Sequence, residues 1–184
     1  MLDKLIVLDR DGVINLDSDN YIKTVDEWIP EVGSIEAIAK LTSCGFTIVI
    51  ATNQSGISRG YYSHQTLNEM HNKLRQLCAE QGGKISAIFY CPHGPDDNCS
   101  CRKPKPGLFT HIEKYYSTSL NNVYTIGDSY RDLEAGLKVS VKPILVLTGK
   151  GKKTLAEKAK ELKAYNIPIK KNLLDAVEYV CNIG

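Results

Sequence analysis

Acidic residues follow two short apolar segments of the chain, at places where the ends of buried strands would gather them. Asp9 and Asp11 come directly after the first apolar segment, and Asp128 and Asp132 come after the fourth. Carboxylates this close repel one another unless a cation lies among them, and oxygen ligands of this kind favour Mg²⁺. One carboxylate can attack a phosphoryl group as a nucleophile, and a second can protonate the leaving oxygen and then activate water. The pattern predicts Mg²⁺-dependent phosphoryl transfer through a carboxylate.

Hydrogen-bond donors and positive charge, which a transferring phosphoryl group also needs, stand at comparable positions. Thr52 and Asn53 follow the second apolar segment, and Arg102 and Lys103 lie in a later loop. A single Asp-x-Asp is more often a turn or a pair of solvated acids. Here, however, acidic, amide and hydroxyl side chains each follow a different predicted strand. Because the ends of parallel strands lie at one edge of a sheet, this pattern indicates one shared site.

Four metal-binding side chains are concentrated within eleven residues. Cys91, His93, Cys99 and Cys101 form the pattern C-x-H-x₅-C-x-C. Three thiolates and one imidazole complete a tetrahedral Zn²⁺ site that leaves no open position for water, so the predicted zinc is structural. It would shape an inserted loop over residues 91–101 and fix the two basic residues that follow. The alternative is a set of buried free thiols beside a surface histidine.

The segments that must position these residues alternate between strands and helices. Five apolar, β-rich runs predict strands buried on both faces of a parallel sheet: Leu5–Leu8, Phe46–Ala51, Ile85–Tyr90, Val123–Ile126 and Ile144–Leu147. Apolar stripes at helical spacing predict helices over Ile35–Thr42, Leu67–Cys78 (N-cap Ser63, stop Gly82), Leu108–Tyr116 (Pro106 in the first turn), Arg131–Lys138, Lys153–Ala164 and Leu173–Cys181. This alternation predicts an α/β fold with right-handed crossovers, a doubly wound parallel sheet and helices on both faces.

The composition is that of an ordinary globular protein. With 184 residues, of which 42% are hydrophobic and 24% charged, we expect one domain over residues 1–184. A net charge of +2 gives no reason to expect binding to nucleic acids or membranes. The first residues match neither a signal peptide nor a membrane span, so we expect a cytoplasmic protein with reduced cysteines.

Together, these motifs resemble a known superfamily. The set Asp9-x-Asp11-Gly12-Val13, Thr52, Lys103 and Gly127-Asp128-x-x-x-Asp132 is similar to the four signature motifs of the haloacid dehalogenase-like (HAD) phosphatases. Their order agrees, and they extend from position 9 to position 132. The longer segments DRDGVIN, ATNQSGISRGYYS and CPH…CSCRKPKPG resemble the group of histidinol-phosphate phosphatases and D-glycero-D-manno-heptose 1,7-bisphosphate phosphatases.

The resemblance implies a role for each matching acid. Asp9 becomes the nucleophile and a Mg²⁺ ligand, and Asp11 becomes the general acid and base, with its backbone carbonyl on the metal. Asp128 is implied to be the later Mg²⁺ ligand, with Asp132 orienting the ligand shell. Ser129 departs from related enzymes, which often carry a basic residue directly after the metal-binding aspartate.

The remaining matches concern the phosphoryl group and the loop. Thr52 and Asn53 are implied to hydrogen-bond the phosphoryl oxygens. Lys103 is implied to neutralise charge between the nucleophile and the phosphate, and Arg102 to bind the substrate. The resemblance independently implies the same zinc loop.

No segment between the first two predicted strands is long enough for a large cap domain, so we expect an open site. Candidate substrate-binding residues are Asn53, Gln54 and Ser55 for hydroxyl groups, and Arg59, Arg102 and Lys105 for a second phosphate. The resemblance implies a monomer that removes the C7 phosphate of heptose 1,7-bisphosphate during heptose nucleotide and lipopolysaccharide precursor synthesis.

Three alternatives stay open at this point. A histidinol-phosphate phosphatase would share the motifs, although its cationic substrate should favour acids over these arginines and lysines. A polynucleotide 3′-phosphatase belongs to the same superfamily, but it should bind DNA in a salt-sensitive manner, which the net charge disfavours. A zinc-stabilised binding module with a vestigial site would have no reason to keep Asp9, Asp11, Lys103 and Asp128 together.

Overall fold

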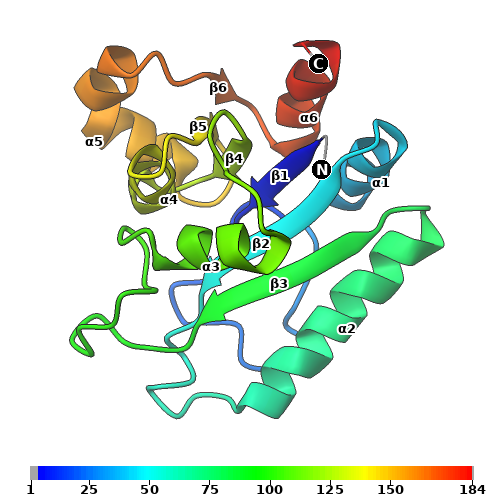
Figure 1. Ribbon diagram of the computed structural model, residues 1–184. Helices are drawn as coiled ribbons and strands as arrows, with labels where there is room; N and C mark the ends of the chain where they lie inside the picture. The colour runs from blue at the N-terminus through cyan, green and yellow to red at the C-terminus, as the bar shows by residue number, and fades with distance from the viewer. Residues whose placement is uncertain (1–3, 184) are drawn as a thin grey trace.

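A computed structural model describes residues 4–183 and contains one parallel sheet (Figure 1). Its strands are β1 (Leu5–Leu8), β2 (Thr47–Asn53), β3 (Ile85–Cys91), β4 (Tyr124–Gly127), β5 (Lys142–Val146) and β6 (Ile169–Lys170). They lie in the order β3-β2-β1-β4-β5-β6, and every pair of neighbours is parallel. The expected α/β class with a parallel sheet is confirmed.

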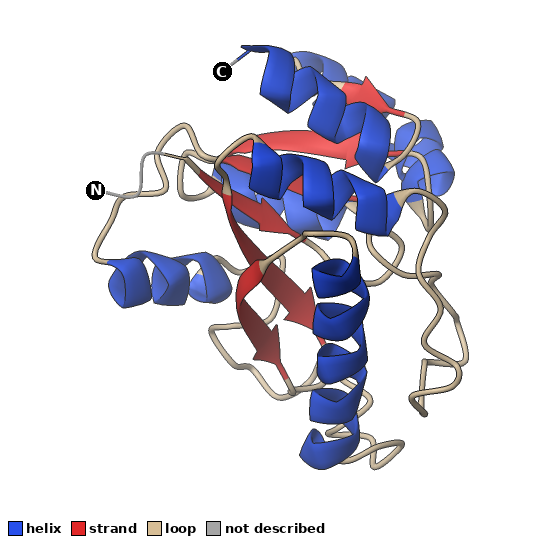
Figure 2. Ribbon diagram, turned by 90° about the vertical axis from the view of Figure 1, so that its right-hand side faces the viewer, coloured by secondary structure: helices blue, strands red, loops and turns tan. Residues whose placement is uncertain are grey.

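Six helices cover the two faces of the twisted sheet (Figure 2). They are α1 (Ser34–Ser43), α2 (His64–Glu80), α3 (Gly107–Tyr116), α4 (Tyr130–Leu137), α5 (Gly151–Ala164) and α6 (Leu173–Ile183). Helices α1, α2 and α6 pack on one face, and α3, α4 and α5 pack on the other. None of the helices within residues 4–183 has the length and apolarity needed to cross a bilayer.

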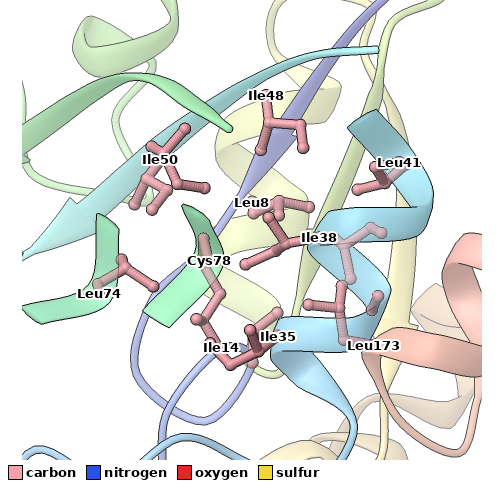
Figure 3. Close-up of a cluster of buried hydrophobic side chains, with 14 of the residues drawn as sticks. Leu8, Ile14, Ile35, Ile38, Leu41, Ile48, Ile50, Leu74, Cys78 and Leu173 are labelled. Atoms are coloured by element: carbon pink, nitrogen blue, oxygen red, sulfur yellow. The ribbon is translucent and has the colours of Figure 1, made fainter. Parts of the chain in front are cut away.

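The core follows from the alternation of side chains along buried strands. In β1, Ile6 and Leu8 point to the cluster under α1, α2 and α6, whereas Leu5 and Val7 point to the cluster under α3 and α4. Figure 3 shows the first cluster, in which Leu8 lies beside Ile38 of α1. Because both faces of the sheet are buried, its strands read as continuous apolar runs rather than as alternating patterns.

The strand order places the first and fourth strands at the centre of the sheet. From β1 the chain leads to β2 and β3 on one side, whereas β4, β5 and β6 extend on the other side. Connections that diverge in this way leave a crevice at the carboxyl ends of the two central strands. Asp9 follows β1 and Asp128 follows β4, so the topology brings both acids to this crevice.

Most boundaries deviate from the sequence prediction by one to three residues. Strand β2 extends through Thr52 and Asn53, which were expected just after it, because both continue the ladder with β3. Ser63 is the N-cap of α2 and accepts a hydrogen bond from the Thr66 N–H, as predicted. Pro106 precedes the first residue of α3 rather than lying in its first turn. Strand β6 was missed because its two residues form no recognisable pattern.

The region between β1 and β2 holds a loop and the single helix α1. The expectation that no large cap domain is inserted there is therefore confirmed. The predicted zinc loop lies between the tip of β3 and the start of α3, beside the carboxyl ends of the strands (Figure 1).

We predict that Ile38→Ala lowers the free energy of unfolding by about 2–5 kcal/mol, because it leaves a cavity in a fully buried site. Urea denaturation followed by circular dichroism measures this. Val32→Ala is the matched control, since Val32 is 90% exposed and its truncation should change stability by less than about 0.5 kcal/mol. Equal effects of the two substitutions would contradict the packing of α1 described above.

Candidate active site

A buried lysine joins two acids from different strand ends. Lys103 Nζ donates a hydrogen bond to Asp9 Oδ1 at 2.8 Å and forms an ion pair with Asp132 Oδ1 at 2.7 Å. It donates a second hydrogen bond to the Ala51 carbonyl oxygen at 2.8 Å. Lys103 is only 3% exposed. Burial alone would lower the pKa of this ammonium group, but the charges of Asp132 and Asp9 outweigh burial and raise it. Lys103 therefore stays a cation beside the predicted nucleophile.

Three carboxylates crowd next to this lysine. Asp9, Asp128 and Asp132 each offer an oxygen within 4.8 Å of the others. Burial, followed by the charge of Asp132, raises the pKa of Asp9 to about 6 in spite of Lys103. Burial and the charges of Asp132 and Asp9 raise the pKa of Asp128 to about 8. One ammonium group does not balance three buried carboxylates, so the cluster has the charge of a cation site.

The orientation of Asp128 fits such a cation. Its Oδ2 accepts a hydrogen bond from the Lys150 N–H at 2.7 Å, whereas its Oδ1 is buried and has no hydrogen-bond partner. Gly12 and Gly149 approach the carboxylate closely, and a Cβ atom at either position would collide with it. Both glycines adopt positive φ angles, 79° and 52°. The backbone therefore surrounds this carboxylate and leaves one oxygen free for a hard cation.

Asp132 is oriented by the start of α4. The Ser129 N–H donates a hydrogen bond to Asp132 Oδ2 at 3.1 Å, and Ser129 is the N-cap of the helix. A serine is among the residues most favoured at an N-cap. Ser129, where related enzymes often carry a basic residue, is therefore well suited to begin the helix that carries Asp132, although it places no positive charge at that position.

Asp11 lies in a separate, dense hydrogen-bond network. It accepts bonds from Arg10 Nη2 (2.8 Å), Asn15 Nδ2 (2.9 Å) and Gln54 Nε2 (2.7 Å). Burial raises the pKa of Asp11, but the Arg10 charge and these hydrogen bonds together lower it below its ordinary value. Asp11 is thus a carboxylate at neutral pH, in the form that accepts a proton.

Arg10 was not predicted as part of the site, yet it is 1% exposed and holds Asp11 through two of its nitrogens. Its Nη1 lies 3.3 Å from His71 Nε2. Burial and the Arg10 charge lower the pKa of His71 to about 3, so the imidazole is neutral and its Nε2 can accept from Arg10. His71 lies on the buried face of α2 and serves as a packing residue whose ring nitrogen is satisfied by Arg10. No pattern in the sequence indicates that Arg10 is buried, because an arginine between two aspartates is ordinarily exposed to solvent.

The polar residues at the end of β2 contact other site residues. Asn53 Nδ2 donates to the Lys103 carbonyl oxygen, and the Lys103 N–H donates to Asn53 Oδ1, both at 3.0 Å. Gln54 Nε2 is also 2.9 Å from Thr52 Oγ1. Asn53, Gln54 and Ser55 line a pocket of about 170 Å³ together with Asp11. Asn53 thus fixes the backbone of Lys103, and all three residues face the pocket.

The basic residues divide into two groups. Arg102 lines the pocket, where its Nη1 donates to the His93 carbonyl oxygen at 3.1 Å. Arg59 and Lys105 are not among the pocket-lining residues; the Arg59 guanidinium lies over the Tyr21 ring, and Lys105 Nζ donates to the Cys99 carbonyl oxygen. Arg131 and Lys150, which were not proposed for the substrate, line the pocket instead.

The four predicted zinc ligands converge at the start of the loop after β3. Cys91 Sγ lies 3.6 Å from Cys99 Sγ and 3.1 Å from Cys101 Sγ, and His93 Nδ1 lies 3.4 Å from Cys101 Sγ. In a tetrahedral site with Zn–S bonds near 2.3 Å, sulfur atoms are about 3.8 Å apart. The arrangement and the soft donor set fit Zn²⁺, and Arg102 directly follows the last ligand.

Comparisons with known proteins agree with this geometry. A family model described as HAD-hydrolase-like matches residues 100–175. The D-glycero-beta-D-manno-heptose-1,7-bisphosphate 7-phosphatase of Pseudomonas aeruginosa is 59% identical over 153 residues, which are 83% of this chain and 86% of the relative. The enzyme of the same name from Neisseria meningitidis serogroup A is 50% identical over 177 residues, or 96% and 94% of the two chains. The chain belongs to this HAD phosphatase family.

Solved structures of the family share the whole fold. A crystal structure of D,D-heptose 1,7-bisphosphate phosphatase from B. bronchiseptica, in complex with magnesium and phosphate, has a TM-score of 0.94 at 46% identity. The match covers 98% of this chain and 99% of the chain in that crystal structure. The counterpart from Burkholderia thailandensis has a TM-score of 0.71 at 38% identity, with 97% and 98% covered. The family resemblance inferred from the motifs is therefore confirmed.

We predict that Asp128→Asn stabilises the protein when divalent cations are removed with EDTA. The pKa of Asp128 rises from 3.8 to about 8 on folding, so the folded protein binds more protons than the unfolded chain in this window. The stability of the wild type should therefore fall as pH rises from about 4 to about 8. The variant lacks this titration and keeps an acceptor for the Lys150 N–H.

Thermal and urea unfolding at pH 5 and pH 8 measure the difference. In EDTA, the free energy of unfolding of the variant relative to that of the wild type should be higher at pH 8 than at pH 5, by on the order of 2 kcal/mol. Added Mg²⁺ should stabilise the wild type but not the variant. Identical pH slopes in EDTA would show that Asp128 carries no such electrostatic penalty.

Proposed function

We propose that this protein hydrolyses the C7 phosphate of D-glycero-β-D-manno-heptose 1,7-bisphosphate, through an aspartyl phosphate, in the synthesis of heptose nucleotide and lipopolysaccharide precursors. The buried Asp9–Lys103 pair beside an acid cluster carries the proposal, because it presents a carboxylate nucleophile with a fixed cation. The names of the relatives supply the sugar and its anomer. Their 50–59% identity over most of the chain supports assigning the same activity to this protein.

Asp9 and Asp11 divide the reaction into two steps. In the first step, a carboxylate oxygen of Asp9 bonds to phosphorus and the bond from phosphorus to the C7 oxygen breaks. Asp11, which has first taken a proton from solvent, gives that proton to the C7 oxygen. In the second step, Asp11 takes a proton from water while the water oxygen bonds to phosphorus. The bond to Asp9 then breaks, which releases inorganic phosphate and restores the carboxylate. Lys103 offsets negative charge in both steps.

The chain offers a magnesium site for this chemistry. The carboxylates of Asp9 and Asp128 and the backbone carbonyl of Asp11 would hold Mg²⁺, with Asp132 orienting the ligands. The unpartnered, buried Oδ1 of Asp128 supports this assignment, as does the magnesium in the B. bronchiseptica complex. When bound, Mg²⁺ neutralises charge on the phosphoryl oxygens and lowers the repulsion between phosphate and nucleophile.

Cys91, His93, Cys99 and Cys101 would hold a structural Zn²⁺. Such a clamp would fix the backbone just before Lys103, whose ammonium group must reach Asp9. Thiolate ligands need a reducing compartment, which supports a cytoplasmic location. We also keep the prediction that the chain acts as a monomer and as one domain over residues 1–184.

The pocket suits a small, polar, phosphorylated substrate. Asn53, Gln54 and Ser55 offer hydrogen-bond partners for sugar hydroxyl groups, while Arg102 offers charge for phosphate. Thr52 would hydrogen-bond the phosphoryl oxygens, since its hydroxyl lies within the same network as Gln54. The predicted contact of Arg59 with a second phosphate would require this arginine to move from the Tyr21 ring.

Phosphate release tests the proposed function directly. We expect a large preference for the β-anomer of heptose 1,7-bisphosphate over its α-anomer, histidinol phosphate and a 3′-phosphorylated oligonucleotide, and we expect EDTA to abolish it. A preference for histidinol phosphate or the oligonucleotide would replace the proposed substrate. Release from none of the four would favour a binding module without catalysis.

Asp9→Asn should lower kcat by at least about 10³-fold, because the amide cannot form the acyl phosphate. Its circular dichroism spectrum should stay unchanged, since the side chain keeps its shape. Turnover close to that of the wild type would exclude Asp9 as the nucleophile.

Cys99→Ala should reduce bound zinc, measured by elemental analysis, from one equivalent to well below one, and lower the melting temperature. Cys78→Ala is the control, because Cys78 lies in the apolar core away from the cluster and its loss should not change the zinc content. A metal-free wild type purified without chelators would contradict the zinc assignment.

A further inference from the structure

Arg131 is a pocket-lining cation without a protein partner. Its side chain contributes to the pocket that Asp11 and Arg102 also line. The Nε atom of Arg131 is buried and has no hydrogen-bond partner, and no salt bridge to its guanidinium is found within residues 4–183. A buried donor left unpaired is costly, so such a group in a pocket points to a missing ligand.

The other cations around this pocket are already engaged. Arg10 is held by Asp11, Gln54 and His71. Lys150 Nζ lies 3.1 Å from a carboxylate oxygen of Asp17. Arg102 donates to a backbone carbonyl at the zinc loop. Arg131 is therefore the pocket cation, among the described residues, whose hydrogen-bonding capacity is least used.

Nearby acids keep Arg131 charged without neutralising it at short range. Burial would lower the pKa of its guanidinium, but the charges of Asp132, Asp9 and Asp128 raise it further above its usual value. Arg131 is also the second residue of α4, the helix whose start orients Asp132. A rigid element thus carries this cation, which makes it a suitable fixed contact for an anion.

We propose that Arg131 binds the phosphate group of the substrate that is not transferred, which in the proposed reaction is the phosphate on C1. This assignment rests on the proposed function. The transferred group has its own cation in Lys103, which is buried, paired with Asp9 and not among the residues that line the pocket. Arg131 instead faces the open volume, where the rest of a bisphosphate must lie. Arg131 would thus make the enzyme specific for a bisphosphate and replace the cation that Ser129 does not provide.

The test compares two sugars that differ only in this phosphate, heptose 1,7-bisphosphate and heptose 7-phosphate. The wild type should prefer the bisphosphate. Arg131→Met should lower kcat/KM for the bisphosphate by about 10- to 100-fold, mainly through KM, because it removes charge-assisted hydrogen bonds made in the bound ground state. The same variant should lose no more than about threefold on the monophosphate. Arg131→Lys should recover part of the loss.

Lys160→Met is the control for the loss of one positive charge, since Lys160 is exposed on α5 outside the pocket. Melting temperatures show whether each variant is folded. Equal losses on both sugars, or a loss confined to kcat, would assign Arg131 to the transferred group or to the acid cluster and overturn the proposal. No preference of the wild type for the bisphosphate would overturn it as well. If the wild type released phosphate from neither sugar, the proposed function itself would fail.

Discussion

The ammonium group of Lys103, buried between two carboxylates, is the interaction on which the site depends. It joins the loop before α3 to Asp9 at the end of β1 and to Asp132 in α4. These segments are distant in sequence, and each is anchored by its own backbone contacts. Removing the ammonium group would leave these buried carboxylates without their cation, which costs on the order of 3–5 kcal/mol. The fold must therefore keep all three segments in register.

Several features of the molecule serve to place this one lysine. Asn53 forms two hydrogen bonds with the backbone of Lys103 from the end of β2. The four predicted zinc ligands converge in the loop that leads to Lys103, and a metal held there would fix a loop that has few apolar residues to pack. A long, flexible side chain loses entropy when it is ordered, so a fixed backbone on both sides reduces the freedom that remains to be lost. The loop over residues 91–101 and β2 thus both serve to position Lys103.

The sequence predicted those features that depend on residue type and short spacing. The predicted zinc ligands fall within eleven residues, and the acids follow strongly apolar strands, so both groups of side chains could be anticipated from the sequence, and the structure brings each group together. Arg10 could not, because nothing local shows that a charged residue between two aspartates is fully buried against His71. The contact of Lys150 with Asp128 could not be predicted either, because it is made by the backbone N–H of Lys150, and a backbone donor leaves no signature in the sequence. Two-residue β6 is too short for any periodicity.

Asp9 and Asp11 are separated by one residue, yet their surroundings act on them in opposite directions. Burial and a neighbouring carboxylate raise the pKa of Asp9, whereas Arg10 and the hydrogen-bonding side chains of Asn15 and Gln54 lower that of Asp11. Strand β1 ends at Leu8, directly before these acids, so that Asp9 stays beside the buried strand end while Asp11 lines the pocket. Two carboxylates whose surroundings shift their pKa values in opposite directions can take different roles in acid–base chemistry. A cation among Asp9, Asp128 and Asp132 would favour the charged form of Asp9 and leave Asp11, outside that cluster, to exchange protons.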